Sequence, residues 1–515
     1  MPQKPYLMLL AAAILVFIMN IDYTAVNLAL VPIAEDVGGD LNTLQWLLSI
    51  YVLAWGACVI PGGRLADFYG KKPMLMLGIM GFMLGSLVTG MGHNDVILIM
   101  GRVLQGIGAA LFSAPLYALI FSAVPQHKQG MAMGIMGGAA GLGLAMGPTL
   151  AGWIIQIIGW RWIFIINLPL GMLVMAILWR YAPAIEQQTK SERLNWVNAS
   201  LLAAGLGMLV MALNQVEIWG AGDYRLWGLV AISMTLLTLF WRLDQHALVQ
   251  MMPRNLLQYK PYLATLILAF CVSYGFAIVM VIMGLYMQNT LKLDSMSTGQ
   301  MFLSMTLALG VLSVVGGRIV DRLDSRIPTV LGAVILALAL VLLGTLNVHA
   351  DLLRVSAFLF LAGIGLGICF PAMNTLVFRT VPSEAVNVGS AVFTMIVMLG
   401  NSISVIISTS LIIIVGHSSL REIIANSGYA LTSTQELSLF TMLTQVEHTA
   451  AQLSNLSADQ IPFWLSAVDQ AFVRGMHYAM WSAAVLVVLS AIVCLKYLRK
   501  LHCNQQGSNS TPIAI

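Results

Sequence analysis

The sequence predicts an all-α membrane protein of fourteen transmembrane helices, built from two pseudo-symmetric six-helix bundles with a two-helix insertion between them. Three observations lead to this fold: the composition, the spacing of the apolar stretches, and a short string that occurs twice. The chain of 515 residues is 59% hydrophobic and only 9% charged, whereas charged residues make up about a quarter of an ordinary soluble domain. This composition excludes a soluble globular protein.

Apolar stretches long enough to cross the hydrocarbon core recur along the whole chain, and each crossing takes about 20 residues. They lie at residues 7–30, 45–63, 73–91, 96–119, 131–153, 162–180, 196–213, 226–243, 262–287, 299–316, 328–346, 354–377, 388–415 and 476–497. The first stretch runs too far, into Asp22, to be a typical signal peptide, and it lacks a clear cleavage site. A polytopic helical protein is therefore predicted.

Two pairs of similar strings indicate an internal duplication. Gly-Gly-Arg-Leu-Ala-Asp at 62–67 returns 254 residues later as Gly-Gly-Arg-Ile-Val-Asp at 316–321. The stretch at 106–125 resembles the stretch at 363–382, which lies 257 residues later. Because the two offsets nearly agree, the halves are in register. Duplicated helical bundles are a usual architecture for transporters.

The duplication also predicts the domain boundaries. Residues 1–182 form the first six-helix bundle, and residues 183–260 hold cytoplasmic connectors and two inserted helices that have no counterpart. Residues 261–502 form the second bundle, including an outer segment at 416–472 that is expected to be partly helical. The tail at 503–515 is predicted to be disordered, because it contains the small and polar run Gly-Ser-Asn-Ser-Thr-Pro at 507–512.

Basic residues predict the orientation. With both termini in the cytoplasm, most of the 25 lysines and arginines, such as Lys71, Lys72 and Arg326, lie on the cytoplasmic side, as positive-inside sorting requires. We therefore expect a multi-pass protein of the bacterial inner (cytoplasmic) membrane with both termini cytoplasmic. The net charge of +4 gives no sign of a nucleic-acid partner, and the basic face is expected to meet anionic membrane lipid.

The residue pattern gives no sign of an enzyme. The five cysteines are isolated and the eight histidines are nowhere paired at helical spacing, so neither a metal site nor a catalytic cluster is predicted. The glycine-rich run at 363–367 lies inside an apolar helix, which favours close helix packing over dinucleotide binding. No phosphate-binding loop with Gly-Lys-Ser/Thr occurs. We expect no cofactor and an ion gradient as the energy source.

Asp22 and Arg102 are the charged residues that the predicted spans place well inside the membrane. A charge near the bilayer centre costs at least about 2.5–3.5 kcal/mol on insertion scales, so each should face a partner or a water-filled cavity. Burial disfavours the charged carboxylate and a nearby arginine favours it. This competition favours proton coupling at Asp22 over a purely structural pair, whereas for Arg102 both roles stay open.

Five strings in order resemble motifs of the major facilitator superfamily, and in particular of its fourteen-helix drug:proton antiporters (EmrB/QacA-like). They lie at residues 22–30, 63–72, 98–110, 143–152 and 160–171. Two strings depart from the family pattern, because Ala151 replaces a usual glycine and Val31 precedes Pro32 where the proline usually follows directly. The resemblance covers almost the whole chain and implies a major facilitator fold whose halves rock around a central cavity.

The string at 63–72 is interpreted as a conformational latch rather than only a basic topogenic loop. Its glycines permit a tight turn and close helix approach, and its aspartate can pair with a cation or cap a neighbouring helix end. The expected latch residues are Gly63, Arg64, Asp67, Gly70, Lys71 and Lys72, with Asp321 from the second copy. The second copy lacks the Gly-Lys-Lys ending, so it matches the motif less well.

The fifth span is rich in glycine, and the resemblance gives it a role between the bundles. The residues that match the antiporter motif are Gly143, Gly147, Pro148 and Gly152. In resembling antiporters this helix limits leak during exchange, although simple tight packing explains the glycines as well. Six polar residues are candidates for lining the cavity, and each could equally be a packed residue. They are Asn27, Gln105, Tyr117, Tyr274, Asn374 and Asn401.

These features predict a proton-coupled antiporter that exports hydrophobic drugs or toxic compounds by alternating access. A lone membrane acid is compatible with lipophilic cations that compete with the proton, but it does not decide the substrate charge. The alternative is an exporter or importer of an endogenous metabolite or lipid on the same fold. Because EmrB-like exporters work with a periplasmic adaptor protein, residues 416–472 could contact one, or they could cap the cavity alone.

Overall fold

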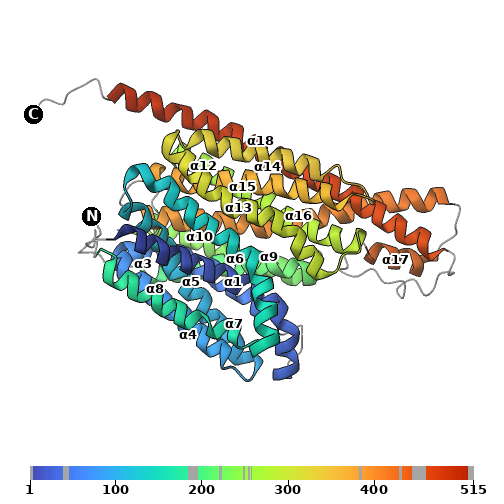
Figure 1. The fold of residues 1–515 in the computed structure, drawn as a ribbon, viewed down its shortest axis with the longest axis horizontal. Helices are drawn as coiled ribbons and strands as arrows, with labels where there is room; N and C mark the ends of the chain where they lie inside the picture. The colour runs from blue at the N-terminus through green and yellow to red at the C-terminus, as the bar shows by residue number, and fades with distance from the viewer. Residues whose placement is uncertain are drawn as a thin grey trace, which may run out of the picture.

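A computed structural model describes residues 4–38, 44, 46–183, 195–219, 223–247, 250–252, 256, 258–381, 385–427, 432–442 and 460–508. Within these ranges the regular secondary structure is helical throughout. Fourteen of the helices are long and apolar enough to cross a membrane. The predicted all-α fold with fourteen spans is confirmed, and the helices of the two halves gather on opposite sides of the molecule (Figure 1).

The first bundle consists of the first six membrane-spanning helices of the chain. They are α1 (Pro5–Val37), α3 (Trp46–Tyr69), α4 (Lys71–Gly90), α5 (Asp95–Ala123), α6 (Gln129–Ile158) and α8 (Asn167–Tyr181), with the short α7 (Trp162–Ile165) before α8. Local chemistry sets several boundaries. Gly38 ends α1 in a left-handed conformation (φ 69°), and the Asn94 side chain accepts a hydrogen bond from the Ile97 N–H at the start of α5.

The inserted helices are α9 (Trp196–Trp219) and α10 (Tyr224–Gln245). Helix α9 packs against both α3 of the first bundle and α16 (Val386–Ser427) of the second. Asp244, at the end of α10, is buried and accepts hydrogen bonds from the Asn198 side chain and from the N–H groups of Met251 and Met252. These bonds fix the start of the following connector against the inserted pair.

The second bundle repeats the arrangement of the first. Besides α16, it contains α12 (Lys260–Leu285), α13 (Ser295–Arg322), α14 (Arg326–Leu343), α15 (Leu352–Thr380) and α18 (Ile461–Ser508), with a π-helical turn at Tyr286–Thr290. Buried apolar side chains form one cluster that fills this bundle and continues into α9 and α3. Two further clusters fill the first bundle, so the apolar core is continuous across part of the seam between the halves.

Two helices extend beyond any membrane span. Helix α16 has 42 residues and α18 has 48, which at 1.5 Å per residue makes them about 63 and 72 Å long, against about 30 Å for the hydrocarbon core. Their outer ends and α17 (Ser433–Met442) form the described parts of the segment at 416–472, and these parts are helical.

Helix α18 is described to Ser508 and so includes residues 503–508 of the tail, whose disorder stays a prediction. A helix that is already formed adds residues at little cost, and no proline or glycine precedes Gly507 in this stretch. Residues 509–515 lie outside the described part of the chain.

The repeated Gly-Gly-Arg strings lie inside helices, not in loops as the motif suggested. Helix α3 continues through Tyr69 and α13 through Arg322, since neither string contains a residue that must break a helix. The turn after α3 occurs only at Gly70, whose φ of 95° is a conformation that glycine adopts without strain. The other glycines of the strings therefore serve close helix approach.

Candidate functional site

Asp22 and Arg102 form an ion pair inside the first bundle. Asp22 lies on α1 and Arg102 on α5, and both side chains are 0% exposed. The Arg102 Nη1 donates to Oδ2 of Asp22 and, at 2.8 Å, to Oε1 of Gln105, while its Nε donates to the carbonyl oxygen of Leu47 at 2.9 Å. The pairing that the sequence predicted as a possibility is therefore present.

Polar side chains from two more helices complete the cluster. Oδ1 of Asp22 accepts from Nδ2 of Asn167 at 2.9 Å and from Nε2 of Gln105 at 3.1 Å. The Ser86 hydroxyl on α4 accepts from the same two amide groups, at 3.1 and 2.6 Å. Removing two ions from water costs several kcal/mol per ion unless close pairing and further hydrogen bonds compensate. This network supplies both.

Sequence reasoning found Asp22 and Arg102 but missed Ser86, Asn167 and Tyr51, whose ring centre lies 4.4 Å from the guanidinium carbon of Arg102. A signal existed for Asn167, an amide within the apolar string at 160–171. Ser86 and Tyr51 carry no charge and match no spacing rule, so only the packing of α3 and α4 against α5 reveals them. The repeat-related positions of Arg102 and Gln105 hold Leu359 and Ala362, both 0% exposed, so the polar cluster has no copy in the second bundle.

The first Gly-Gly-Arg string contacts the second bundle. Oδ1 of Asp67 accepts from Nδ2 of Asn387, the second residue of α16, at 2.6 Å. A Cβ added to Gly63 would lie 2.8 Å from the Asn387 carbonyl oxygen, so only glycine allows this approach. Arg64 lies 3.6 Å from Asp67 on the same helix. These contacts join α3 of the first bundle to the start of α16 of the second, and the latch role stays a prediction.

The second string makes the mirror contacts. The carboxylate of Asp321 accepts from the N–H groups of Gly130 and Met131, at 2.6 and 2.8 Å, at the start of α6. A helix N-terminus favours a negative charge. A Cβ on Gly317 would lie 2.2 Å from the Gly130 carbonyl oxygen. Since Asn387 lies 257 residues after Gly130, the two contacts follow the internal repeat.

The basic residues of the string act within their own bundle. The Lys72 ammonium donates to the carbonyl oxygens of Trp179 and Ala182, at 2.6 and 2.9 Å, and so caps the end of α8. Cations at a helix C-terminus satisfy its free carbonyl groups. Lys71 begins α4 beyond the turn at Gly70. The structure therefore gives Lys72 a contact that does not bridge the halves.

Helix α6 contacts both halves, with different glycines on each side. A Cβ on Gly134 would lie 2.2 Å from the Ser313 carbonyl oxygen on α13 of the second bundle. A Cβ on Gly143 would lie 2.7 Å from the Phe17 carbonyl oxygen, and one on Gly147 would lie 1.9 Å from Oγ1 of Thr24, both on α1. The predicted antiporter residues thus pack within their own bundle, and the glycines before them form the seam.

Among the other members of the predicted motif, Gly152 adds no close helix contact. Gly152 has only Leu28 in ordinary contact, at 3.9 Å. Pro148 lies within α6, which continues to Ile158.

The six predicted cavity residues do not come together. Gln105 belongs to the ion-pair cluster, because the Asp22 carboxylate offers its amide a stronger partner than water, and Tyr274 is 1% exposed inside the second bundle. Asn27 is exposed on α1, whereas Tyr117, Asn374 and Asn401 are partly buried. Asn374 donates to the Phe370 carbonyl oxygen of its own helix, and Oδ1 of Asn401 is buried without a hydrogen-bond partner.

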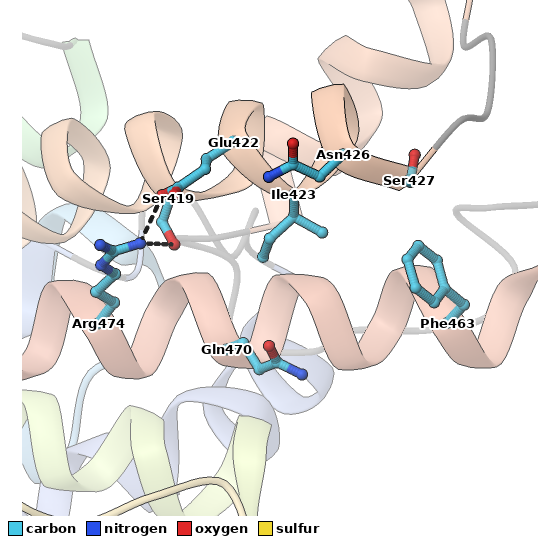
Figure 2. A pocket seen from close by; sticks show the side chains of 8 residues that line it. All are labelled: Ser419, Glu422, Ile423, Asn426, Ser427, Phe463, Gln470 and Arg474. Atoms are coloured by element: carbon cyan, nitrogen blue, oxygen red, sulfur yellow. Dashed lines mark hydrogen bonds and ion pairs between the residues drawn. The ribbon is translucent and has the colours of Figure 1, made fainter.

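A pocket of about 770 Å³ lies at the far end of the molecule from the two motif aspartates, between the ends of α16 and α18. Figure 2 shows Arg474 reaching from α18 to Glu422 and Ser419 on α16, at 2.8 and 3.4 Å. Glu422 and Arg474 are both more than half exposed. The pocket therefore belongs to the outer segment and is separate from the buried cluster.

Comparisons with known proteins agree on one family. Residues 12–405 match the Major Facilitator Superfamily. The chain is 27% identical to the tetracenomycin C resistance and export protein of Streptomyces glaucescens, over 78% of this chain and 74% of that protein. It is 25% identical to the multidrug transporter protein MdtP of Bacillus subtilis, over 75% and 71%. It is 26% identical to a triacylglyceride transporter of Mycolicibacterium smegmatis, over 77% and 73%.

A solved structure supports the fold. The human organic anion transporter MFSD10 aligns with a TM-score of 0.60 at 13% identity, over 96% of this chain and 100% of that one. At this identity the likeness concerns the fold alone. Family and fold are those of membrane transporters, not enzymes.

Proposed function

Because the chain belongs to the Major Facilitator Superfamily, we propose that it is a proton-coupled antiporter that exports hydrophobic drugs or toxic compounds by alternating access. Two of its relatives are described as a resistance and export protein and as a multidrug transporter. The observation that carries proton coupling is the Asp22–Arg102 pair, which is fully buried and held by neutral hydrogen-bond donors.

The cluster suits a proton switch because Asp22 and Arg102 have different interaction partners, and so a different free energy, in each protonation state of Asp22. When Asp22 is charged, its carboxylate pairs with Arg102 and accepts three hydrogen bonds, one from Arg102 and one each from Gln105 and Asn167. With Asp22 neutral, Arg102 keeps its charge, since a guanidinium does not lose its proton in proteins, but it loses its main partner. A rearrangement of the surrounding helices is the natural response. Proton uptake at Asp22 from outside would favour substrate release, and proton release inside would restore substrate affinity.

The two motif aspartates supply the conformational part of the proposal. Asp67 and Asp321 join the halves at one end of the molecule, here called the latch end, through contacts with α16 and α6. In the same region Phe121 of α5 stacks on Phe378 of α15, with ring centroids 4.8 Å apart. These residues are related by the 257-residue repeat. We assign the latch end to the cytoplasm from the basic residues, so the arrangement described is closed toward the cytoplasm.

The decisive experiment replaces the acid. Asp22→Asn keeps the size and the hydrogen-bonding shape but removes the titrating group, so transport driven by a pH gradient in vesicles should be lost while the protein still reaches the membrane. Exchange of substrate for substrate without a gradient should continue, which separates coupling from folding. Full gradient-driven transport by this variant would rule out Asp22 as the coupling site.

A second candidate function is transport of an endogenous metabolite or lipid. The specific support is the relative described as a triacylglyceride transporter. Uptake and efflux measured in inside-out and right-side-out vesicles, with lipophilic cations, neutral drugs and neutral lipids as parallel substrates, would distinguish the two functions.

The outer segment is proposed to act either as a docking surface for a periplasmic adaptor protein or as a cap. Part of it packs on the transmembrane helices, because α17 contacts α16 and α18 and its Leu439 and Met442 are fully buried. Co-purification of the adaptor candidate with the full chain and with a chain lacking residues 420–470 would decide, since a cap would change transport but not adaptor retention.

A further inference from the structure

We propose that Tyr51 is a positioning residue of the proton switch: its ring holds the Arg102 guanidinium when Asp22 is protonated, and so sets how tightly Asp22 binds its proton. This inference rests on the proposed role of Asp22. It adds a residue that carries no charge and that no sequence motif singles out.

The geometry places Arg102 between one carboxylate and two aromatic rings. The guanidinium carbon lies 4.4 Å from the centre of the Tyr51 ring on α3 and 5.8 Å from the centre of the Phe164 ring on α7. Both distances lie within the range of cation–π attraction, which is about 6 Å. Tyr51 and Phe164 are fully buried, so water does not weaken the attraction.

Two polar atoms at this place lack partners. Nη2 of Arg102 and the hydroxyl of Tyr51 are buried and have no hydrogen-bond partner among the described residues. Nη2 is therefore the side of the guanidinium that the carboxylate network leaves unsatisfied. A guanidinium that is only half satisfied by hydrogen bonds depends on the π face beside it.

The sign of the effect follows from the net charge of the cluster. While Asp22 is ionised, the Asp22–Arg102 pair is neutral overall and the ring contributes little. Once Asp22 is protonated, Arg102 is an uncompensated buried cation, and the ring becomes its main support. Tyr51 therefore stabilises the protonated state more than the ionised state, and its loss should weaken proton binding by Asp22.

Other groups around Asp22 do not supply this support. Helices α4, α5 and α8 present the neutral Ser86, Gln105 and Asn167, and Tyr23 is its neighbour on α1. Helix α6, which packs along α1, contains no titratable side chain over its whole length, and α7 contains none. Arg102 is the one charged group that the described contacts bring to Asp22.

The experiment measures the protonation of Asp22 directly in the purified full chain. Infrared difference spectra across a pH titration report the carbonyl band of the protonated carboxyl group, assigned by its absence in Asp22→Asn. Tyr51→Leu should lower the pH midpoint of this band by about one unit, a tenfold weaker proton affinity. Tyr51→Phe keeps the π face and removes only the unpaired hydroxyl, so its midpoint should match that of the natural protein.

Two controls separate the ring's electrostatics from packing. Phe82→Leu removes a ring of the same bundle that meets the Phe112 ring edge-to-face and not the Arg102 guanidinium, and it should leave the midpoint unchanged. Phenylalanine analogues with increasing ring fluorination at position 51 weaken the π face at nearly constant size, so the midpoint should fall stepwise. This series also decides the question if Tyr51→Leu does not fold.

The outcomes distinguish the two proposals. If Asp22 titrates and its midpoint is the same in Tyr51→Leu and across the fluorinated series, the role of Tyr51 is overturned and proton coupling at Asp22 stands. If no band is lost in Asp22→Asn at any accessible pH, Asp22 is not a proton site and both proposals fail.

Discussion

Asp36 shows how a single exposed carboxylate joins two elements of the first bundle. At the end of α1 it accepts hydrogen bonds from the Arg161 guanidinium and, at 3.2 Å, from Nε1 of Trp160. The guanidinium also stacks on the Trp160 ring at 4.4 Å. The hydrogen bond from Arg161 is the main cause that lowers the pKa of Asp36 below its ordinary value of 3.8, with the nearby positive charge adding to it.

A lowered pKa predicts a defined pH dependence. The stability that Asp36 contributes is present above its unfolded pKa and is lost as the pH falls through its lower folded pKa. In detergent, the difference in melting temperature between the natural protein and Asp36→Asn should therefore vanish at acidic pH and be constant near neutral pH. Arg161→Gln should reduce the same difference near neutral pH, while the hydrogen bond from Trp160 keeps part of it. A gap between the natural protein and Asp36→Asn that grows toward acidic pH would contradict this assignment.

Charge and polarity explain which site residues the sequence could predict. Asp22 and Arg102 were predictable because a charge in an apolar span is costly and needs a partner. Tyr51 and Ser86 were not, because an aromatic ring or a hydroxyl is ordinary in any membrane helix. Helical spacing places Gln105 on the same face of α5 as Arg102, which allows a polar network between them, but it does not show which helix covers that face, so Gln105 was also a cavity candidate.

Helix α6 shows the same limit at the scale of an element. The glycine content of α6 predicted that another helix approaches it closely, but not that two different helices do so at different positions along it. Residues near Gly134 contact α13 of the second bundle, and residues near Gly143 contact α1 of the first. One helix thus fixes the geometry inside its own half and the seam between halves.

Substitutions along α6 test this division. Gly134→Ala places a Cβ against the Ser313 backbone, and overpacking of this kind costs about 1–3 kcal/mol. A lower melting temperature and a wider seam are expected. Gly152→Ala is the matched control on the same helix: its Cβ meets only ordinary contact, and alanine gains up to about 1 kcal/mol in helix propensity. Equal melting temperatures in the two variants would refute the close approach.

At the scale of the whole molecule, duplication determines how the halves meet. Asp67 and Asp321 each bind the start of a helix in the opposite half. The topology and the number of spans were predictable, because the length of each apolar stretch and the offset between the repeated strings stay recognisable after the sequences of the two halves have diverged. The contacts across the seam were not, since they depend on the rotation of each helix about its axis.

Loss of one latch contact should shift the balance between the two arrangements. Hydrogen bonds to charged acceptors contribute about 1.5–3 kcal/mol each, so Asp321→Asn should favour opening of the latch end by roughly tenfold or more. Spin labels on cysteines at Gln126 and Leu323, in a background free of native cysteines, would report the separation of the halves. Asn387→Ala should act in the same direction. Unchanged distance distributions in both variants would show that neither contact holds the halves together.

The two latch contacts differ in how much they depend on the side chain of the donor residue. Asp321 accepts from backbone N–H groups, which every residue except proline supplies, so a substitution at Met131 that fits the space leaves its donors intact, whereas Gly130 has no room for a Cβ, which would lie 2.4 Å from the Gly317 carbonyl oxygen. Asp67 depends on the side chain of one residue, Asn387. A single base change in that codon can weaken one contact while the other persists. We therefore expect position 387 to be where natural variation can adjust the conformational balance of the transporter without dismantling it.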